Sequence, residues 1–349
     1  MKIALTGFSN SGKTTLFNAL TRQKIDTSPS ITPPDVIHKG IIQVEDSRLK
    51  NISELVKPKK KTFATVECID TAGLLKNNLV HNSRVIKNII EADAFIYVLR
   101  GFGDLSIPYQ FDSLDPSRDF LELEYEFLII DLDLVTKRIE RIEEQKKKGQ
   151  KINEREREVL IILQQHLENG KPLRTAQISD EKFNEIRHLN FLTLKPVIAV
   201  TNVDEKSFNS GKYKDLDFIT ICGSLESEIS QLPCDEVYNF LDAMGIDEPV
   251  SKKIIKKVYE ILNYITFFTI ISQEARAWSI HKGTKALEAA GKIHSDIQRG
   301  FIKAEVISYE DFLSLQGDLG LAKQKGILRL EGKEYEVKDG DIITFKFKV

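Results

Sequence analysis

Residues 7–14 place glycine, lysine and threonine at the spacing of a phosphate-binding loop, G-x-x-x-x-G-K-T. The glycines let the chain turn tightly, so that successive backbone N–H groups face one phosphate chain. In such a loop, Lys13 reaches the terminal phosphates of a nucleotide and Thr14 offers its hydroxyl group to Mg²⁺. The residues expected to bind the nucleotide here are Asn10, Ser11, Gly12, Lys13, Thr14 and Thr15.

The elements that must position this loop lie on both sides of it. Residues 3–5 are an apolar run typical of a short buried strand, and residues 15–20 have the pattern of a helix. A helix that begins at the loop adds the partial positive charge of its N-terminus where phosphate binds. Because strand, loop and helix occur in the required order, a chance glycine pattern explains this region poorly.

A second set of candidate groups follows the expected strand at residues 66–69. Asp70 stands at the end of this strand, where a carboxylate can hold Mg²⁺ or its water ligands. Gly73 completes an Asp-x-x-Gly turn, and its backbone N–H can contact the terminal phosphate and sense the nucleotide state. We therefore expect Lys13 and Gly73 to act in catalysis and Asp70 to support the metal.

Leu74 occupies the position directly after this glycine, where many GTPases place a glutamine that orients the attacking water. A leucine side chain has neither a donor nor an acceptor. Either another group positions the water or hydrolysis is slow. A second interpretation is that Leu74 is a loop residue packed beneath the switch.

A third motif is expected to contact the base. Residues 196–201 have the apolar, β-branched pattern of a buried strand, and the chain continues with Asn202, Val203, an aspartate and Glu205. Guanine-specific proteins usually carry Asn-Lys-x-Asp here, so Glu205 and Val203 weaken the prediction of guanine specificity. Gly223 follows one more expected strand and is placed on the other face of the base. The alternative is that Asn202 only caps a turn.

The composition limits the class of protein. A length of 349 residues predicts two or three domains, and a net charge of −2 argues against binding to nucleic acid by bulk charge alone. The three cysteines are widely spaced, which suits a reducing compartment and predicts neither a metal site nor a disulfide framework. The chain passes directly into a strand and has no apolar run of membrane-spanning length. We expect a cytoplasmic monomer without membrane contact.

Together these motifs resemble those of the YchF / Obg-like ATPase family of translation-factor-class P-loop proteins, over nearly the whole chain. That family has a hydrophobic residue at the glutamine position and Asn-x-x-Glu as its base motif, so the resemblance implies a preference for ATP over GTP. It also implies slow hydrolysis of ATP to ADP and phosphate with Mg²⁺, and a ribosome as the partner. The matching stretches are residues 7–14, 70–74, 115–119, 202–205 and the C-terminal region.

The metal ligands expected from the sequence are Thr14, Asp70 and, in the first switch, Thr32. Simple alignment with the family places Ile31 on the usual threonine, and Thr32 is the nearest residue with an oxygen donor. The prolines around it stiffen this loop.

Two further places depart from the family's pattern. The segment after Gly73 is shorter than the Gly-rich segment that the family usually has. Pro108 stands near the position of a family histidine proposed to assist hydrolysis, and proline offers no proton or water chemistry. His81 is the nearest histidine in the sequence, without a sign that it reaches the site.

The chain between Asp70 and Asn202 is far longer than a sheet of this kind requires, and the excess lies in residues 131–190. Apolar residues recur there at helical spacing on both sides of a lysine-rich turn, which predicts two antiparallel helices with a glycine at the tip. The charged faces are most simply solvated surface. The alternative is an arm that touches RNA or a partner through the residues Lys146, Lys147 and Lys148.

The region after residue 266 has a different sequence pattern from the rest of the chain. Residues 267–271 and 342–347 have strand patterns, and residues 339–341 form a turn between strands. The region resembles the TGS domain, a compact β-grasp unit that ends this family and offers a second contact for RNA. Trp278 is expected to pack in its core rather than to stack on a base.

The predicted fold class is α/β, with a P-loop NTPase parallel sheet, an inserted helical hairpin and a C-terminal β-grasp domain similar to TGS. The expected boundaries are 1–130 and 191–265 for the nucleotide-binding domain, 131–190 for the hairpin and 266–349 for the tail.

Two alternatives to a ribosome-associated ATPase stay open on the sequence. One is a GTPase translation factor, in which Glu205 mimics the usual aspartate. The other is a nucleotide-binding switch with negligible turnover, which Leu74 and Pro108 favour. A small-molecule kinase is a weaker alternative because no acceptor pocket or lid motif is evident.

Overall fold

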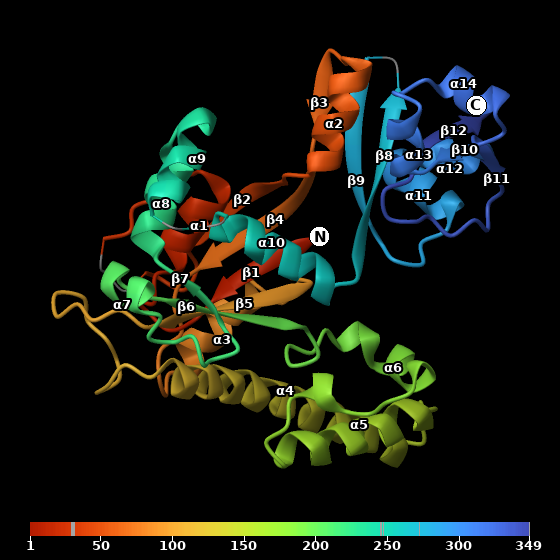
Figure 1. Ribbon diagram of the computed structural model, residues 1–349. Coiled ribbons are helices and arrows are strands. Elements are labelled where there is room, and N and C mark those ends of the chain that lie inside the picture. Colours follow the sequence, from red (N-terminus) through yellow and green to blue (C-terminus); the bar gives the residue numbers. More distant parts are fainter. Residues whose placement is uncertain (29–31, 245, 247, 272, 349) are drawn as a thin grey trace. The chain divides into compact units, whose positions relative to one another are not determined.

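The computed structural model describes residues 1–28, 32–244, 246, 248–271 and 273–348. Contacts along the chain divide it into two units, which are described separately (Figure 1). The first unit comprises Met1–Ile41 and Glu67–Ser251, and the second comprises Ile42–Val66 and Lys252–Val349.

The first sheet has the strand order β2-β4-β1-β5-β6-β7. Its strands are β1 (Lys2–Thr6), β2 (Ile37–Val44), β4 (Ala64–Thr71), β5 (Ala94–Arg100), β6 (Val197–Asn202) and β7 (Ile219–Ile221). The pairs β1–β4, β1–β5, β5–β6 and β6–β7 are parallel. Every residue of β5 is buried, as expected for the centre of a parallel sheet covered on both faces. The loops that follow β1, β4 and β6 therefore meet at one edge.

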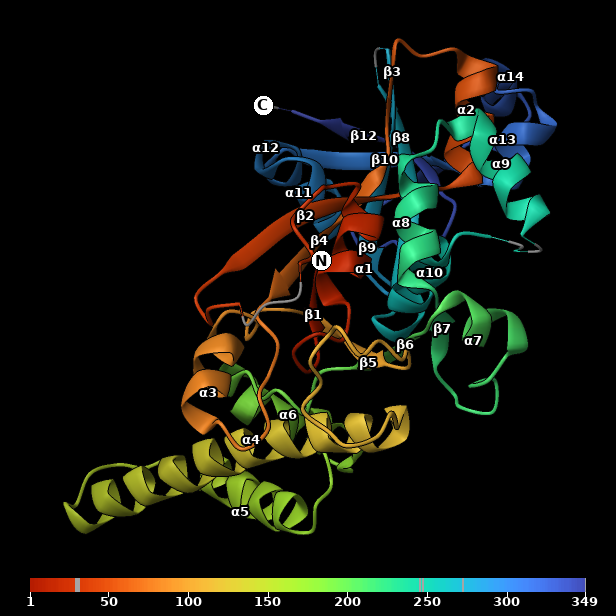
Figure 2. The ribbon, with the colours of Figure 1, turned by 90° about the vertical axis from the view of Figure 1, so that its left-hand side faces the viewer.

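Helices cover both faces of this sheet. On one face, α3 (Leu79–Lys87) and α4 (Pro116–Lys147) share a core with β5 that includes Ile86, Phe95 and Phe127. On the other face, α1 (Lys13–Thr21) packs against α8 (Gly223–Gln231), and Figure 2 shows both on the side opposite α4. Apart from the second helix of the hairpin, the other helical segments of this unit are α6 (Asp180–Ile186), η1 (Leu173–Thr175), η2 (Arg187–Leu189), α7 (Glu205–Ser210) and α9 (Cys234–Ala243).

The helical hairpin consists of α4 and α5 (Glu154–Glu168), whose apolar sides share a core with the returning chain at Phe191. The first helix begins at Pro116, well before the expected boundary at residue 131. Asp115 caps it, because its side chain accepts a hydrogen bond of 3.0 Å from the Arg118 N–H, and proline suits the first helical position. The N-terminal part of α4 therefore packs on the sheet, and only its later part forms the hairpin.

The second sheet has the strand order β11-β10-β12-β8-β9-β3. Its strands are β3 (Lys60–Thr62), β8 (Tyr264–Ile271), β9 (Glu274–His281), β10 (Phe301–Ile307), β11 (Arg329–Glu331) and β12 (Ile342–Phe347). Phe267 and Phe268 of β8 point to opposite faces and enter two different cores. Trp278 packs against Phe267 with ring centroids 6.4 Å apart, in agreement with the expected core role.

Helices line both cores of the second unit. Its helices are α2 (Ser47–Val56), α11 (Ala286–Ile293), α12 (Ser295–Arg299), α13 (Tyr309–Ser314) and α14 (Leu319–Gln324), and α10 (Val250–Ile261) precedes β8. The α/β fold class is confirmed. In the described part of the chain, no helix has both the length and the apolar character needed to cross a bilayer.

The segment 42–66 differs most from the expected boundaries, because it packs with the C-terminal region. Leu49 and Ile52 of α2 enter a core with Phe268 and Phe312, and β3 pairs in parallel with β9. This pairing joins residues far apart in the sequence, so no local pattern signals it. The strands β2 and β4 accordingly begin in one unit and end in the other.

Candidate functional site

The loop after β1 has the backbone of a phosphate-binding loop. Asn10 and Gly12 adopt left-handed conformations, with φ of 62° and 93°, and α1 begins at Lys13. A side chain at Gly12 would place its Cβ 2.0 Å from Nδ2 of Asn202. Position 12 therefore needs glycine for its conformation and for the close approach of Asn202.

Lys13 is buried, and its Nζ donates a hydrogen bond of 2.9 Å to the carbonyl oxygen of Phe8 in the same loop. Burial lowers the pKa of Lys13 to about 8, although the nearby Asp70 carboxylate acts in the opposite direction. A desolvated ammonium group interacts strongly with an anion that enters the loop. This is the arrangement expected of a residue that stabilises phosphate charge.

Thr14 and Asp70 lie together, as predicted. Oγ1 of Thr14 donates a hydrogen bond of 2.9 Å to Oδ2 of Asp70, while Oδ1 of Asp70 is buried and has no hydrogen-bond partner among the described residues. Burial raises the pKa of Asp70, and the contacts with Lys13, Thr14 and His38 oppose that shift. A buried carboxylate oxygen without a partner next to a hydroxyl oxygen fits Mg²⁺, which prefers such hard ligands.

His38 of β2 is a member of this group that the sequence did not reveal. Its Nδ1 lies 3.3 Å from Oδ2 of Asp70. The residue follows the first switch by several positions, and only the pairing of β2 in the sheet brings it to Asp70. Thr32, the expected third ligand, has no hydrogen bond to Thr14 or Asp70 within the described residues, and Ile31 lies outside them.

The Asp-x-x-Gly turn runs directly beside the phosphate loop. The N–H of Leu74 donates to the carbonyl oxygen of Gly7 at 2.9 Å, and the N–H of Ser9 donates to the carbonyl oxygen of Leu74 at 3.1 Å. A Cβ on Gly73 would lie 2.4 Å from Cα of Ser9, so only glycine fits. Among the described residues, none accepts a hydrogen bond from the Gly73 N–H, which leaves this donor for a ligand.

Leu74 itself is fully buried in the core between the sheet and α3. Its side chain is thus a packing residue with no access to water. His81, by contrast, does reach this turn, because its Nε2 lies 2.9 Å from the carbonyl oxygen of Gly73. Pro108 contributes through its backbone, since its carbonyl oxygen accepts a hydrogen bond of 3.0 Å from Nδ2 of Asn10.

Asn202, at the end of β6, joins the phosphate loop to the turn after β7. Its Nδ2 donates to the carbonyl oxygen of Ser11 at 3.2 Å, and its Oδ1 accepts from the N–H of Gly223 at 2.9 Å. A Cβ on Gly223 would lie 3.2 Å from Cγ2 of Thr15. The structure therefore brings Ser11, Thr15, Asn202 and Gly223 together through a buried amide.

The other residues of the base motif separate from Asn202. Val203 is buried, and a Cβ on Gly101 would lie 2.9 Å from its Cγ1. Asp204 caps α7 by accepting a hydrogen bond of 2.8 Å from the Ser207 N–H, which occupies its carboxylate. Glu205 is exposed in the first turn of α7, and no hydrogen bond in the described chain engages its carboxylate.

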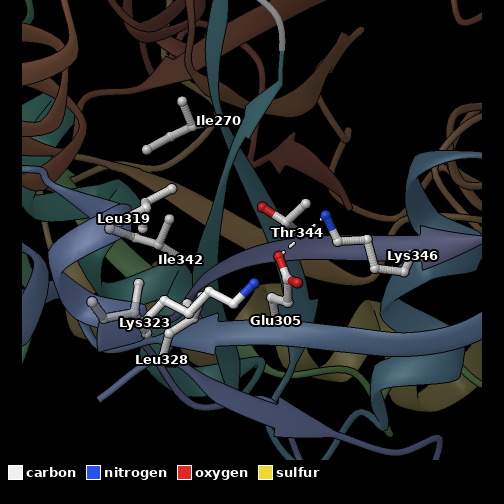
Figure 3. Close-up of a pocket in the computed structure, with 10 residues that line it drawn as sticks. Ile270, Glu305, Leu319, Lys323, Leu328, Ile342, Thr344 and Lys346 are labelled. Atoms are coloured by element: carbon white, nitrogen blue, oxygen red, sulfur yellow. Dashed lines mark ion pairs between the residues drawn. The ribbon is translucent and has the colours of Figure 1, made fainter. Parts of the chain in front are cut away.

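A cavity of about 270 Å³ lies in the second unit, on the face of the second sheet beside α14. Figure 3 shows aliphatic side chains, among them Ile270, Leu319 and Ile342, around it, and an ion pair of 3.2 Å between Lys346 and Glu305. None of the predicted nucleotide-site residues lines it.

The parallel sheet, the phosphate loop after its first strand, the aspartate at the end of β4 and the asparagine at the end of β6 define a P-loop NTPase of the GTPase class. Residues 2–165 match a family described as 50S ribosome-binding GTPase. Residues 264–348 match the C-terminal domain family of YchF GTPases, described as a protein of unknown function (DUF933). The two matches agree with the observed fold.

Several relatives match the chain over its length. A Bacillus subtilis (strain 168) protein named Ribosome-binding ATPase YchF is 38% identical, over 99% of this chain and 98% of the relative. A protein of the same name from Escherichia coli O157:H7 is 36% identical, over 100% of this chain and 99% of the relative. The chain belongs to the YchF family.

Solved structures agree with this assignment. The Schizosaccharomyces pombe YchF GTPase superposes with a TM-score of 0.84 at 26% identity, covering 99% of this chain and 97% of that one. A GTP binding protein from Pyrococcus horikoshii OT3 has a TM-score of 0.57 at 18% identity over the full length of both chains, which shows a shared fold.

Proposed function

We propose that this protein is a ribosome-binding ATPase, which binds ATP with Mg²⁺ and hydrolyses it slowly to ADP and phosphate. The single observation that carries the proposal is the cluster of Lys13, Thr14, Asp70 and Gly73 around one loop. Their distances place a buried cation at the sheet edge beside a carboxylate oxygen and a backbone N–H that have no hydrogen-bond partner in the described part of the chain. The names of the relatives support ATP as the substrate and the ribosome as the partner.

Each group at the phosphate end has a distinct role. Lys13 and the backbone of residues 10–15 stabilise the phosphate charge, and the Gly73 N–H contacts the terminal phosphate. Thr14, Asp70 and Thr32 would hold Mg²⁺, which supplies charge neutralisation on the phosphates. Slow turnover follows from Leu74, because a buried leucine cannot orient the attacking water.

At the base end, we assign Asn202, Val203, Glu205 and Gly223 to the adenine side of the site. Asn202 acts by tying Ser11 to Gly223, so that the loops on the two sides of the nucleotide stay in register. Glu205 is the group available to the base, because its carboxylate is exposed and not engaged.

The remaining parts are assigned to the partner. We propose that the hairpin, residues 131–190, and the β-grasp tail, residues 266–349, contact ribosomal RNA or protein, and that the first unit outside the hairpin is the nucleotide domain. Lys147 and Lys148 are exposed near the tip of the hairpin, and Lys146 pairs with Glu154 at 3.0 Å. The protein would act as a monomer in the cytoplasm, with the nucleotide state setting its affinity for the ribosome.

The test is to measure the affinity for ATP and GTP side by side with Mg²⁺, followed by single-turnover hydrolysis of the preferred nucleotide. Preference for ATP with measurable turnover supports the proposal. Preference for GTP would favour a GTPase translation factor, a class to which the 50S ribosome-binding GTPase family match also points. ATP binding without turnover would leave a binding-only switch.

A further inference from the structure

Gln110 makes a two-point contact with the backbone of the second switch. Its Nε2 donates a hydrogen bond of 3.2 Å to the carbonyl oxygen of Leu74, and its Oε1 accepts one of 2.8 Å from the N–H of Lys76. A primary amide can satisfy a carbonyl and an N–H two residues apart in this manner because it carries a donor and an acceptor side by side.

The rest of this turn is held in a similar way from α3. Asn82 is fully buried, and its amide accepts from the N–H of Leu75 at 2.9 Å and donates to the carbonyl oxygen of Leu75 at 2.8 Å. His81 contacts the carbonyl oxygen of Gly73. Every polar backbone atom from the Gly73 carbonyl to the Lys76 N–H therefore has a partner, whereas the Gly73 N–H has none among the described residues.

The loop that carries Gln110 is itself anchored. Arg100, at the end of β5, is buried and donates hydrogen bonds to the carbonyl oxygens of four residues of this loop. The four residues are Phe102, Asp104, Ile107 and Pro108, at distances from 3.1 to 3.3 Å. The guanidinium carbon also lies 4.4 Å from the ring centre of Phe102 and 4.8 Å from that of Tyr109.

This loop connects the two parts of the site that must act together. The Pro108 carbonyl bonds to Asn10 of the phosphate loop, and Gln110 bonds to the second switch two residues later. Phe111 completes the contact, with its ring centre 5.0 Å from that of Phe8. The loop of residues 108–111 therefore supports both the phosphate loop and the second switch. A displacement of the second switch would break contacts with this shared loop.

We propose that Gln110 is a positioning residue for hydrolysis, which acts through the backbone of Leu74 and Lys76 to keep Gly73 beside the phosphate loop. The inference rests on the proposed function, since it assumes that the chain hydrolyses ATP. Gln110 need not touch the nucleotide. Because the Leu74 side chain is buried, the geometry of this turn depends on its backbone, and the two hydrogen bonds of Gln110 hold that backbone in place.

The test compares Gln110→Ala and Gln110→Glu with the parent chain, using ATP with Mg²⁺. Gln110→Ala removes both contacts, and we expect kcat to fall about tenfold while KM stays within about twofold. Gln110→Glu keeps an acceptor for the Lys76 N–H but has no donor for the Leu74 carbonyl oxygen. Its kcat should therefore lie between those of the parent chain and Gln110→Ala. Gln164→Ala is the matched control, because its amide donates a hydrogen bond to Thr136 within the hairpin and none to the nucleotide site in the described residues.

Hydrogen exchange of the Lys76 amide, with a non-hydrolysable ATP analogue bound, provides a second readout, and we expect faster exchange in Gln110→Ala. If the parent hydrolyses ATP and Gln110→Ala keeps its kcat, the inference fails and the proposed function stands. A parallel loss of kcat, nucleotide affinity and Tm would also overturn it, since that pattern marks a purely structural role. If the parent binds ATP without turnover, the proposed hydrolysis itself fails, and the positioning role with it.

Discussion

The phosphate end and the base end of the candidate site use their polar groups in opposite ways. At the phosphate end, Oδ1 of Asp70, Oγ of Ser11 and the N–H of Gly73 have no partner in the described protein. At the base end, the side chains of Asn202 and Asp204 form hydrogen bonds with backbone groups. We therefore expect most contacts with the nucleotide at the phosphate end, whereas Asn202 and Asp204 mainly hold the loops of the base end in place.

The difference has a physical reason. Buried polar atoms without partners are costly, and they persist where a ligand completes them. A side-chain amide that already has two hydrogen-bond partners gains no free energy by exchanging them for a nucleotide base. A side chain in a recognition motif can therefore serve the site by holding its loops, and mutation of such a residue affects stability as well as affinity.

The largest effect is expected at the phosphate end. Lys13→Ala removes the ammonium group that a hydrogen bond to Phe8 holds inside this loop. Tight binding of ATP should therefore be lost, with an affinity at least about a hundredfold lower. Calorimetric titration with Mg²⁺ measures this. Lys137→Ala, which removes an exposed ion pair with Asp133 on the hairpin, is the control and should bind as the parent does. Equal affinities in the two variants would contradict the phosphate-loop assignment.

Asn202→Ala should have the next largest effect, and it should lower both the stability of the fold and the affinity for ATP. It leaves the carbonyl oxygen of Ser11 and the N–H of Gly223 without their partner, so the free energy of unfolding should fall by about 2 kcal/mol. ATP affinity should fall about tenfold because the phosphate loop loses its support. Chemical denaturation and calorimetry measure the two changes. A loss of affinity without any loss of stability would mean that Asn202 contacts the base directly.

Glu205→Ala should separate the two ends, because the carboxylate is exposed and holds no other element. We expect a decrease in ATP affinity of about threefold and an unchanged free energy of unfolding. Glu205→Asp tests the identity of the base, and its ratio of ATP to GTP affinity should move toward GTP. A ratio that stays constant in both variants would remove Glu205 from the base site.

The smallest effect on the nucleotide is expected from the hairpin tip. Replacing Lys146, Lys147 and Lys148 by glutamate should leave ATP affinity and Tm unchanged, because these side chains support no contact of the nucleotide site. Cosedimentation with ribosomes should weaken, and the loss should diminish at high salt. Normal cosedimentation of this variant at low salt would assign the ribosome contact to another part of the chain.

Local patterns predicted the phosphate loop, the sheet and the hairpin, because each has its own spacing of apolar and glycine residues. The start of α4 was also readable, since Asp115 and Pro116 are a capping residue and a first-turn proline. His38 and Gln110 were not predictable. Each reaches the site through the pairing of strands or the path of a long loop, and neither leaves a mark in the neighbouring sequence.

The membership of segment 42–66 was hidden for the same reason, and it bears on how the chain is made. During synthesis this segment leaves the ribosome early, but Phe268 and Phe312, on which Leu49 and Ile52 pack, lie in the last quarter of the chain. The apolar side chains of this segment therefore lack their packing partners while most of the first unit is synthesised. The order of translation thus delays completion of the second core until the residues that cover α2 have been made.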